Sequence, residues 1–121
     1  MIFEGEVEKG LDIVRTVRER YDGKARNPFN EYECGGWYAR ALSSYSLLQA
    51  LTGLRYDAVD HILYIDSKIG DSFKTFLSTN TGFGTVEVQQ GKPIINVVYG
   101  SLDIESCIVS GNKTDFKYQA N

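Results

Sequence analysis

The chain has few of the residues that metal sites, membrane spans and nucleic-acid interfaces require. Its 121 residues include two cysteines and one histidine, too few for a disulfide framework or a persuasive metal site, so we expect no metal and no cofactor. No apolar run approaches the roughly 20 residues that span a bilayer. The N-terminus also lacks the basic start and long apolar stretch of a signal peptide. We therefore expect no membrane span, and these absences favour a cytoplasmic location.

Basic residues are also sparse relative to acidic ones. The chain has 13 lysines and arginines against 16 aspartates and glutamates, a net charge of −3, and the basic residues are scattered. A nucleic-acid interface requires clustered Lys and Arg, so no nucleic-acid partner is expected. Hydrophobic residues make up 42% and charged residues 24%, which allows a buried core. The length suits one domain, or a fragment of a larger one.

A helical half is expected first, over residues 1–58. One apolar face recurs at the spacing of a helix and comprises Val7, Leu11, Val14 and Val17. Gly23 is placed to end this helix in the left-handed conformation. A second helix is predicted from about Gly36 to Leu51, closed by Gly53. It is apolar around nearly its whole circumference, so other protein should surround it.

A small antiparallel β-sheet is expected next, over residues 59–111, giving an α+β fold of two antiparallel helices followed by the sheet. The predicted strands are short, alternating and punctuated by glycine: Leu63 to Ile65, Phe73 to Leu77, Thr85 to Gln89, Pro93 to Tyr99 and Leu102 to Val109. Gln90-Gly91 and Gly100-Ser101 are predicted as turns between antiparallel neighbours. Residues 112–121 are expected to form a polar tail that frays.

The side chains with the most chemical potential lie in residues 26–40, at the mouth of the second helix. Glu33 lies near the predicted helix N-terminus, about two turns before Arg40, and Glu31 lies on the loop side. A carboxylate and a guanidinium that converge there can hold a vicinal diol, with Trp37 offering an aromatic face to a sugar ring. The alternative is that Glu33 caps the helix, Arg40 pairs with it and the aromatics are core. Glu31 and Glu33 as an acid pair is weaker, because they point different ways.

The same segment resembles a signature of a known enzyme family. It reads Arg-Asn-Pro-Phe-Asn-Glu-Tyr-Glu-Cys-Gly-Gly-Trp-Tyr-Ala-Arg, and the likeness extends over roughly residues 5–60. It is similar to the C-terminal part of glycoside hydrolase family 116, the non-lysosomal glucosylceramidases (bile-acid β-glucosidases) and related β-glucosidases. At Gly36 and Trp37 the chain departs from the polar pair common in the family.

The resemblance implies the last hairpin of a barrel of six helical hairpins, followed by a β appendage. It also implies that Glu31 and Arg40 hold the hydroxyls of a β-linked sugar, while the catalytic carboxylates lie upstream, outside this chain. The expected function is therefore that of a C-terminal β-glycosidase fragment which is inactive alone. The alternative is a stand-alone carbohydrate-binding or oligomerisation module. The uncovered apolar helix further predicts a homodimer.

Overall fold

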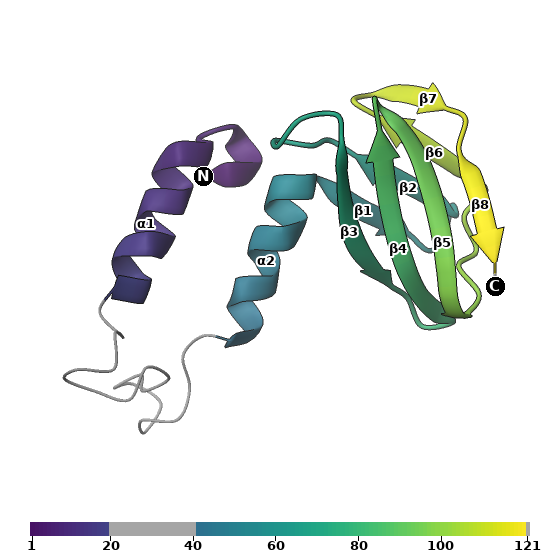
Figure 1. Cartoon of the computed structure of the whole chain (residues 1–121), viewed down its shortest axis with the longest axis horizontal. Helices are drawn as coiled ribbons and strands as arrows, with labels where there is room; N and C mark the ends of the chain where they lie inside the picture. The colour runs from purple at the N-terminus through teal and green to yellow at the C-terminus, as the bar shows by residue number, and fades with distance from the viewer. Residues whose placement is uncertain (20–40, 121) are drawn as a thin grey trace. The chain divides into compact units, whose positions relative to one another are not determined.

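The computed structural model of the protein describes residues 1–19 and 41–120 (Figure 1). The chain divides into two compact units, residues 1–48 and 49–121. Helices lie mainly in the first unit and strands in the second, as the change in sequence texture predicts. The end of the second helix, residues 49–52, belongs to the second unit.

The first unit opens with a short 3-10 turn, η1 (Ile2–Glu4), followed by helix α1 (Val7–Glu19). Ile2 is buried and lies against Gly10 on the helix, where a Cβ atom would approach its side chain to 2.5 Å. The predicted helix is confirmed. Of its predicted apolar face, Val7, Leu11 and Val14 are partly covered, whereas Val17 is 43% exposed. The predicted helix end at Gly23 lies outside the described residues.

Helix α2 (Ala41–Thr52) ends where its sequence predicts. Gly53 adopts the left-handed conformation, with φ of 61°, and its N–H donates to the Gln49 carbonyl at 2.8 Å. A side chain is excluded at Gly53, because a Cβ atom would lie 2.0 Å from the Asp66 carbonyl oxygen. The predicted start of this helix near Gly36 lies outside the described residues.

The second unit is a two-layer β-sandwich of eight strands. In chain order they are β1 (Leu54–Asp57), β2 (Ile62–Ile65), β3 (Phe73–Ser78), β4 (Gly82–Gln89), β5 (Lys92–Gly100), β6 (Ser106–Val109), β7 (Asn112–Thr114) and β8 (Lys117–Ala120). One sheet has the order β1-β2-β6-β7 and the other β3-β4-β5-β8. We call the second the β4 sheet, because it carries the candidate site.

The core lies between the two sheets, and both contribute to it (Figure 1). Its buried members are Leu63, Ile65, Leu77, Val86, Val88, Ile95, Val97, Leu102, Ile104 and Cys107. In β4 and β5 every second side chain points inward, so the alternate residues form an outer face. A two-layer core explains why the strands alternate so clearly in sequence.

The expected small antiparallel sheet is wrong, because the strands form two mixed sheets. β2 pairs with β6 in parallel, and β5 pairs with β8 in parallel. Both parallel pairs form after a crossing between the sheets. After β2 the chain passes through the other sheet before β6 returns beside β2, and after β5 it passes through the first sheet before β8 returns beside β5. Gly100 therefore does not form the predicted antiparallel turn, since the chain after it crosses over to β6. The predicted turn at Gln90-Gly91 is confirmed, and it joins β4 to β5.

The expectation of a fraying polar tail after Gly111 is also wrong. This segment contains two strands: β7 forms one edge of the first sheet and β8 one edge of the β4 sheet. Two aromatic side chains fix this segment to the sandwich, although most of its residues are polar. Phe116 packs against the core, and the Tyr118 hydroxyl accepts the Leu102 N–H at 3.3 Å.

Candidate functional site

All four of the substrate-binding residues predicted from the sequence lie outside the described part of the chain. They are Glu31, Glu33, Trp37 and Arg40. Their convergence on a sugar therefore stays a prediction. The features that the structure does describe point to a different surface, the outer face of the β4 sheet.

The register of the β4 sheet sets the outer-face side chains in rows across the strands. One row contains Lys74, Glu87, Ile94 and Lys117, and the next contains Phe76, Thr85, Asn96 and Gln119. A third row ends the face with Ser78, Phe83 and Tyr99. Cross-strand partners in such rows lie about 5 Å apart, so each row is a continuous strip of side chains.

Three aromatic rings gather at one end of this face. The Phe83 and Tyr99 rings stack, with centroids 5.7 Å apart and an interplanar angle of 23°. Phe76 lies 6.2 Å from Phe83 on the other side. Tyr99 is 70% exposed, Phe76 54% and Phe83 39%. Phe76, Phe83 and Tyr99, which we call the aromatic platform, thus present large ring surfaces to solvent rather than to the core.

A β-bulge builds the stacked pair. The register between β4 and β5 shifts at Phe83 and Gly84: Gly84 lies opposite Val97, whereas Phe83 lies opposite Tyr99, which leaves Val98 as an extra residue. Close backbone packing accompanies the shift. A Cβ atom on Gly84 would lie 1.9 Å from the Asn96 carbonyl oxygen. Glycine is therefore required for the geometry that brings the two rings together.

Polar side chains occupy the middle of the face. Thr85, Asn96 and Gln119 lie side by side across β4, β5 and β8. Lys74 and Glu87 form an ion pair at 3.7 Å between Nζ and Oε2. Amide and hydroxyl groups both donate and accept hydrogen bonds, which suits a ligand rich in hydroxyl groups.

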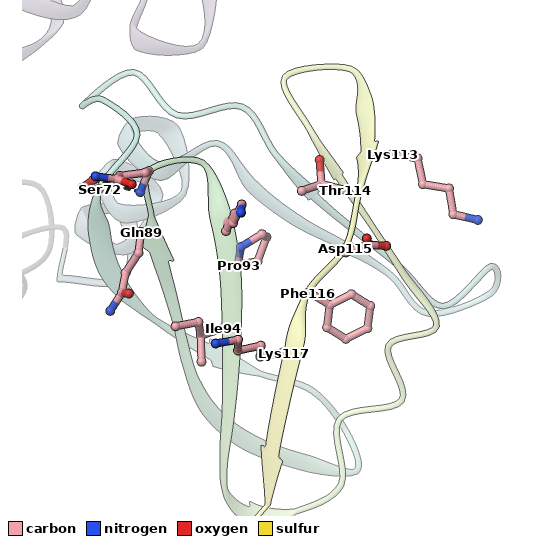
Figure 2. Close-up of a pocket in the computed structure, with 11 residues that line it drawn as sticks. Ser72, Gln89, Pro93, Ile94, Lys113, Thr114, Asp115, Phe116 and Lys117 are labelled. Carbon is pink, nitrogen blue, oxygen red and sulfur yellow. Dashed lines mark hydrogen bonds between the residues drawn. The ribbon is translucent and has the colours of Figure 1, made fainter.

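A groove of about 830 Å³ lies at the other end of the sheet (Figure 2). It is lined by the β4–β5 turn and by the segment that leads from β7 into β8. Its apolar lining is Pro93, Ile94 and Phe116. Lys117 and Ile94 lie beside each other on its wall, as the β5–β8 register requires.

The groove is rich in lysine. Lys92, Lys113 and Lys117 line it, against one carboxylate, Asp115. Within the part of the chain that the structure describes, none of these lysines lies within ion-pair distance of a carboxylate. Positive charge is thus concentrated locally in a chain whose net charge is −3.

The histidine belongs to a structural network. The Tyr56 hydroxyl donates to the Asp103 carbonyl at 2.7 Å, and His61 Nδ1 lies 3.0 Å from the same oxygen. Partial burial raises the pKa of Tyr56, and the nearby carboxylates, led by Asp103, raise it further. These contacts tie the β1–β2 turn to the chain that enters β6. Over residues 1–19 and 41–120, no three His, Cys, Asp or Glu side chains gather as metal ligands would.

The amino-acid sequence matches no protein-family model, and no curated protein is significantly similar to it. Among the helices in the described ranges, none is long and apolar enough to cross a membrane. The likeness to family 116 therefore remains a proposal.

The aromatic platform was missed in the sequence analysis, although a signal for it exists. Phe76 and Tyr99 belong to predicted strands, at positions that point away from the core, whereas Phe83 precedes the predicted strand that starts at Thr85 and lies in β4 in the structure. A large aromatic at a solvent-facing strand position marks a candidate binding surface. The stacking itself depends on the bulge, which strand periodicity does not predict.

Proposed function

We propose that the outer face of the β4 sheet binds carbohydrate, within the C-terminal part of a β-glycosidase resembling family 116. The observation that carries this proposal is the exposed stack of Phe83 and Tyr99. Two exposed rings that already contact each other restrict each other's rotation, so little conformational entropy is lost when a ligand packs against their exposed faces.

The chemistry of the face matches a sugar. The C–H side of a pyranose ring packs against an aromatic ring, while its hydroxyl groups remain available for hydrogen bonds. Asn96 and Thr85 lie directly beside the aromatic platform in the β4–β5 register, and both can exchange hydrogen bonds with hydroxyl groups. A neutral polar strip next to exposed rings favours carbohydrate over a purely apolar partner.

The resemblance in residues 26–40 supports the same ligand class. In this proposal, Glu31 and Arg40 hold the glycone hydroxyls in the parent enzyme, with Glu33 and Trp37 beside them. The parent hydrolyses a β-glucoside with retention, using two carboxylates supplied by other segments. The isolated chain contributes binding groups and performs no hydrolysis itself.

Titration calorimetry of the purified chain with neutral β-linked gluco-oligosaccharides tests the platform. We expect weak but saturable binding, in the millimolar range or tighter, that Phe83→Ala with Tyr99→Ala reduces by at least about tenfold. Phe3→Ala is the control, because Phe3 is also an exposed aromatic, at 61%, but lies in η1. Equal binding by the platform variant and the wild type, with both folded by circular dichroism, would refute the platform.

A separate experiment tests the part of the proposal that rests on the resemblance. The purified chain should not turn over an aryl β-glucoside. In an assembled parent enzyme, Arg40→Ala should cost about 2–4 kcal/mol of transition-state binding, the scale for losing charged hydrogen bonds. Turnover by the isolated chain that disappears on Glu31→Gln or Glu33→Gln would show that it carries its own catalytic carboxylates.

Self-association is the second candidate function, and exposed apolar side chains on the helices favour it. Ile13 is 53% exposed, Val17 43% and Tyr45 69%. Burying such side chains between two copies is favourable, and a symmetric dimer is the commonest arrangement. Light scattering at tens of micromolar separates the two candidates: a dimer that Val17→Ser with Tyr45→Ser dissociates supports this one, whereas a monomeric wild-type mass excludes it.

A further inference from the structure

The aromatic platform and the lysine-lined groove lie at opposite ends of one continuous face. Along β4 the outward residues run from Phe83 at the platform end to Gln89, which lines the groove. At about 3.3 Å per residue, the two ends are separated by roughly 20 Å. Ile94 and Lys117 belong both to an outer-face row and to the groove lining. A ligand that extends along the strands from the platform therefore reaches the groove.

The charge on this face is uneven. Lys74 is paired with Glu87, so their charges offset each other in the middle of the face. Lys92 lies two residues before Ile94 in β5, and Lys117 lies opposite Ile94 in β8. Neither lysine pairs with a carboxylate among the described residues. Lys113 extends away from the β4–β5 turn in Figure 2, and Asp115 is the one carboxylate among the residues that line the groove. The groove end of the face thus has a net excess of cations.

The groove also has the character of a binding site for one part of a larger ligand. Its volume of about 830 Å³ falls in the range of small-ligand sites. Ile94, Pro93 and Phe116 provide apolar contact, and lysines among the lining residues provide positive charge. Apolar walls with mobile ammonium groups suit a sugar ring that carries an anionic substituent.

We propose that this face selects an acidic glycan, an extended β-linked chain whose anionic groups, carboxylates or sulfates, enter the lysine-lined groove. One sugar ring stacks on Phe83 and Tyr99, the next lie over Asn96 and Thr85, and an anionic substituent meets Lys92 and Lys117. The inference rests on the proposed function, because the aromatic platform supplies the contact common to neutral and acidic ligands. The groove adds the preference for the acidic ones.

The experiment compares three oligosaccharides of equal length: a neutral β-glucan, its carboxylated (uronic) form and its sulfated form. At low salt, the 121-residue chain should bind an acidic form about fivefold to tenfold more tightly than the neutral form, the scale of two exposed ion pairs. High salt should remove this preference. Which acidic form binds better distinguishes a carboxylate from a sulfate ligand.

Lys92→Gln with Lys117→Gln should abolish the preference and leave binding of the neutral glycan unchanged. Lys9→Gln with Lys68→Gln is the matched control, because it also removes two positive charges but from outside this face. Lys9 pairs with Glu6, and Lys68 pairs with Asp66. Phe83→Ala with Tyr99→Ala should weaken neutral and acidic ligands alike. Inorganic polyphosphate is the probe for charge attraction alone, and it should bind more weakly than the acidic glycans.

The outcomes separate the two proposals. Neutral and acidic glycans bound equally, through the platform, would overturn the acidic preference and leave the carbohydrate-binding function standing. A preference that survives Lys92→Gln with Lys117→Gln would also overturn it. Polyphosphate bound as tightly as the acidic glycans, independently of Phe83, would reduce the groove to a non-selective anion surface. No binding of any glycan would refute the proposed function itself.

Discussion

Phe83 and Tyr99 stack across β4 and β5 because Val98 is an extra residue in β5. In a regular ladder, Val98 would lie opposite Phe83, and Tyr99 would turn to the inner face opposite Gly82. The bulge absorbs Val98 and returns Tyr99 to the outer face, where it is 70% exposed. A local irregularity of the backbone, rather than aromatic content alone, therefore creates the candidate binding surface.

Gly84→Ala should unfold the sandwich more easily and weaken glycan binding. Its Cβ atom would lie 1.9 Å from the Asn96 carbonyl oxygen, and the backbone cannot yield without disturbing the bulge. We expect a loss of about 2–4 kcal/mol in the free energy of unfolding, measured in urea by circular dichroism. Gly91→Ala is the control: it has open space but a φ of 76°, so only about 1 kcal/mol should be lost. Equal losses would contradict the steric argument.

Tyr118→Phe tests whether the C-terminal segment belongs to the fold. Its hydroxyl accepts the N–H of Leu102, a residue that is only 2% exposed. Removing the hydroxyl leaves that buried N–H without this partner, which costs about 1–3 kcal/mol. Urea unfolding measures the loss. Tyr64→Phe is a suitable comparison, because Tyr64 packs under Arg55 through its ring, 3.9 Å from the guanidinium carbon, and should lose much less. An unchanged free energy of unfolding in the Tyr118→Phe variant would show that β8 frays.

Much of the local structure could be predicted from the sequence because it depends on local patterns. The spacing of Val7, Leu11 and Val14 predicts α1, and Gly53 marks the end of α2. The alternation around Val86 and Val88 predicts β4 and its inward face. Each of these signals acts within about two turns of helix or a few residues of strand.

Strand partners could not be predicted, because alternation is the same in parallel and antiparallel neighbours. Nothing in the sequence of Ser106 to Val109 indicates that β6 joins β2 in parallel rather than β5 in a hairpin. The error at the C-terminus has a similar cause. Composition suggests a solvated tail, whereas two aromatic side chains, Phe116 and Tyr118, fix it to the sandwich through contacts with distant residues.

The thiol of Cys107 should be unreactive while the protein is folded. It is fully buried, and burial raises its pKa to about 12. Since the thiolate is the nucleophile, almost none forms at about pH 8. In a Cys34→Ser variant, which leaves Cys107 as the single thiol, a disulfide reagent such as dithionitrobenzoate should react only after denaturant is added. Rapid reaction with the folded variant would show that the sandwich opens readily near β6.

Protonation of the Asp57 carboxylate in acid should lower the stability of the sandwich. Its carboxylate accepts the Asp60 N–H at 3.2 Å and the Val59 N–H at 3.0 Å in the β1–β2 turn. These two bonds, and more weakly the Arg55 charge, hold the pKa of Asp57 below its ordinary value. Because the folded pKa is the lower one, the stabilisation is complete above the unfolded pKa, about 3.9, and is lost as pH falls through the folded pKa.

Comparing urea unfolding of the wild type and Asp57→Ala at neutral pH and at about pH 2–3 measures this effect. The wild type should be more stable at neutral pH, and the difference should shrink in acid as the carboxylate becomes protonated. Asp57→Asn is the matched control, because its side-chain oxygen can still accept both N–H bonds but does not titrate. Its difference from Asp57→Ala should therefore not change with pH. A wild-type advantage that is the same at both pH values would show that the turn does not depend on the charge of Asp57.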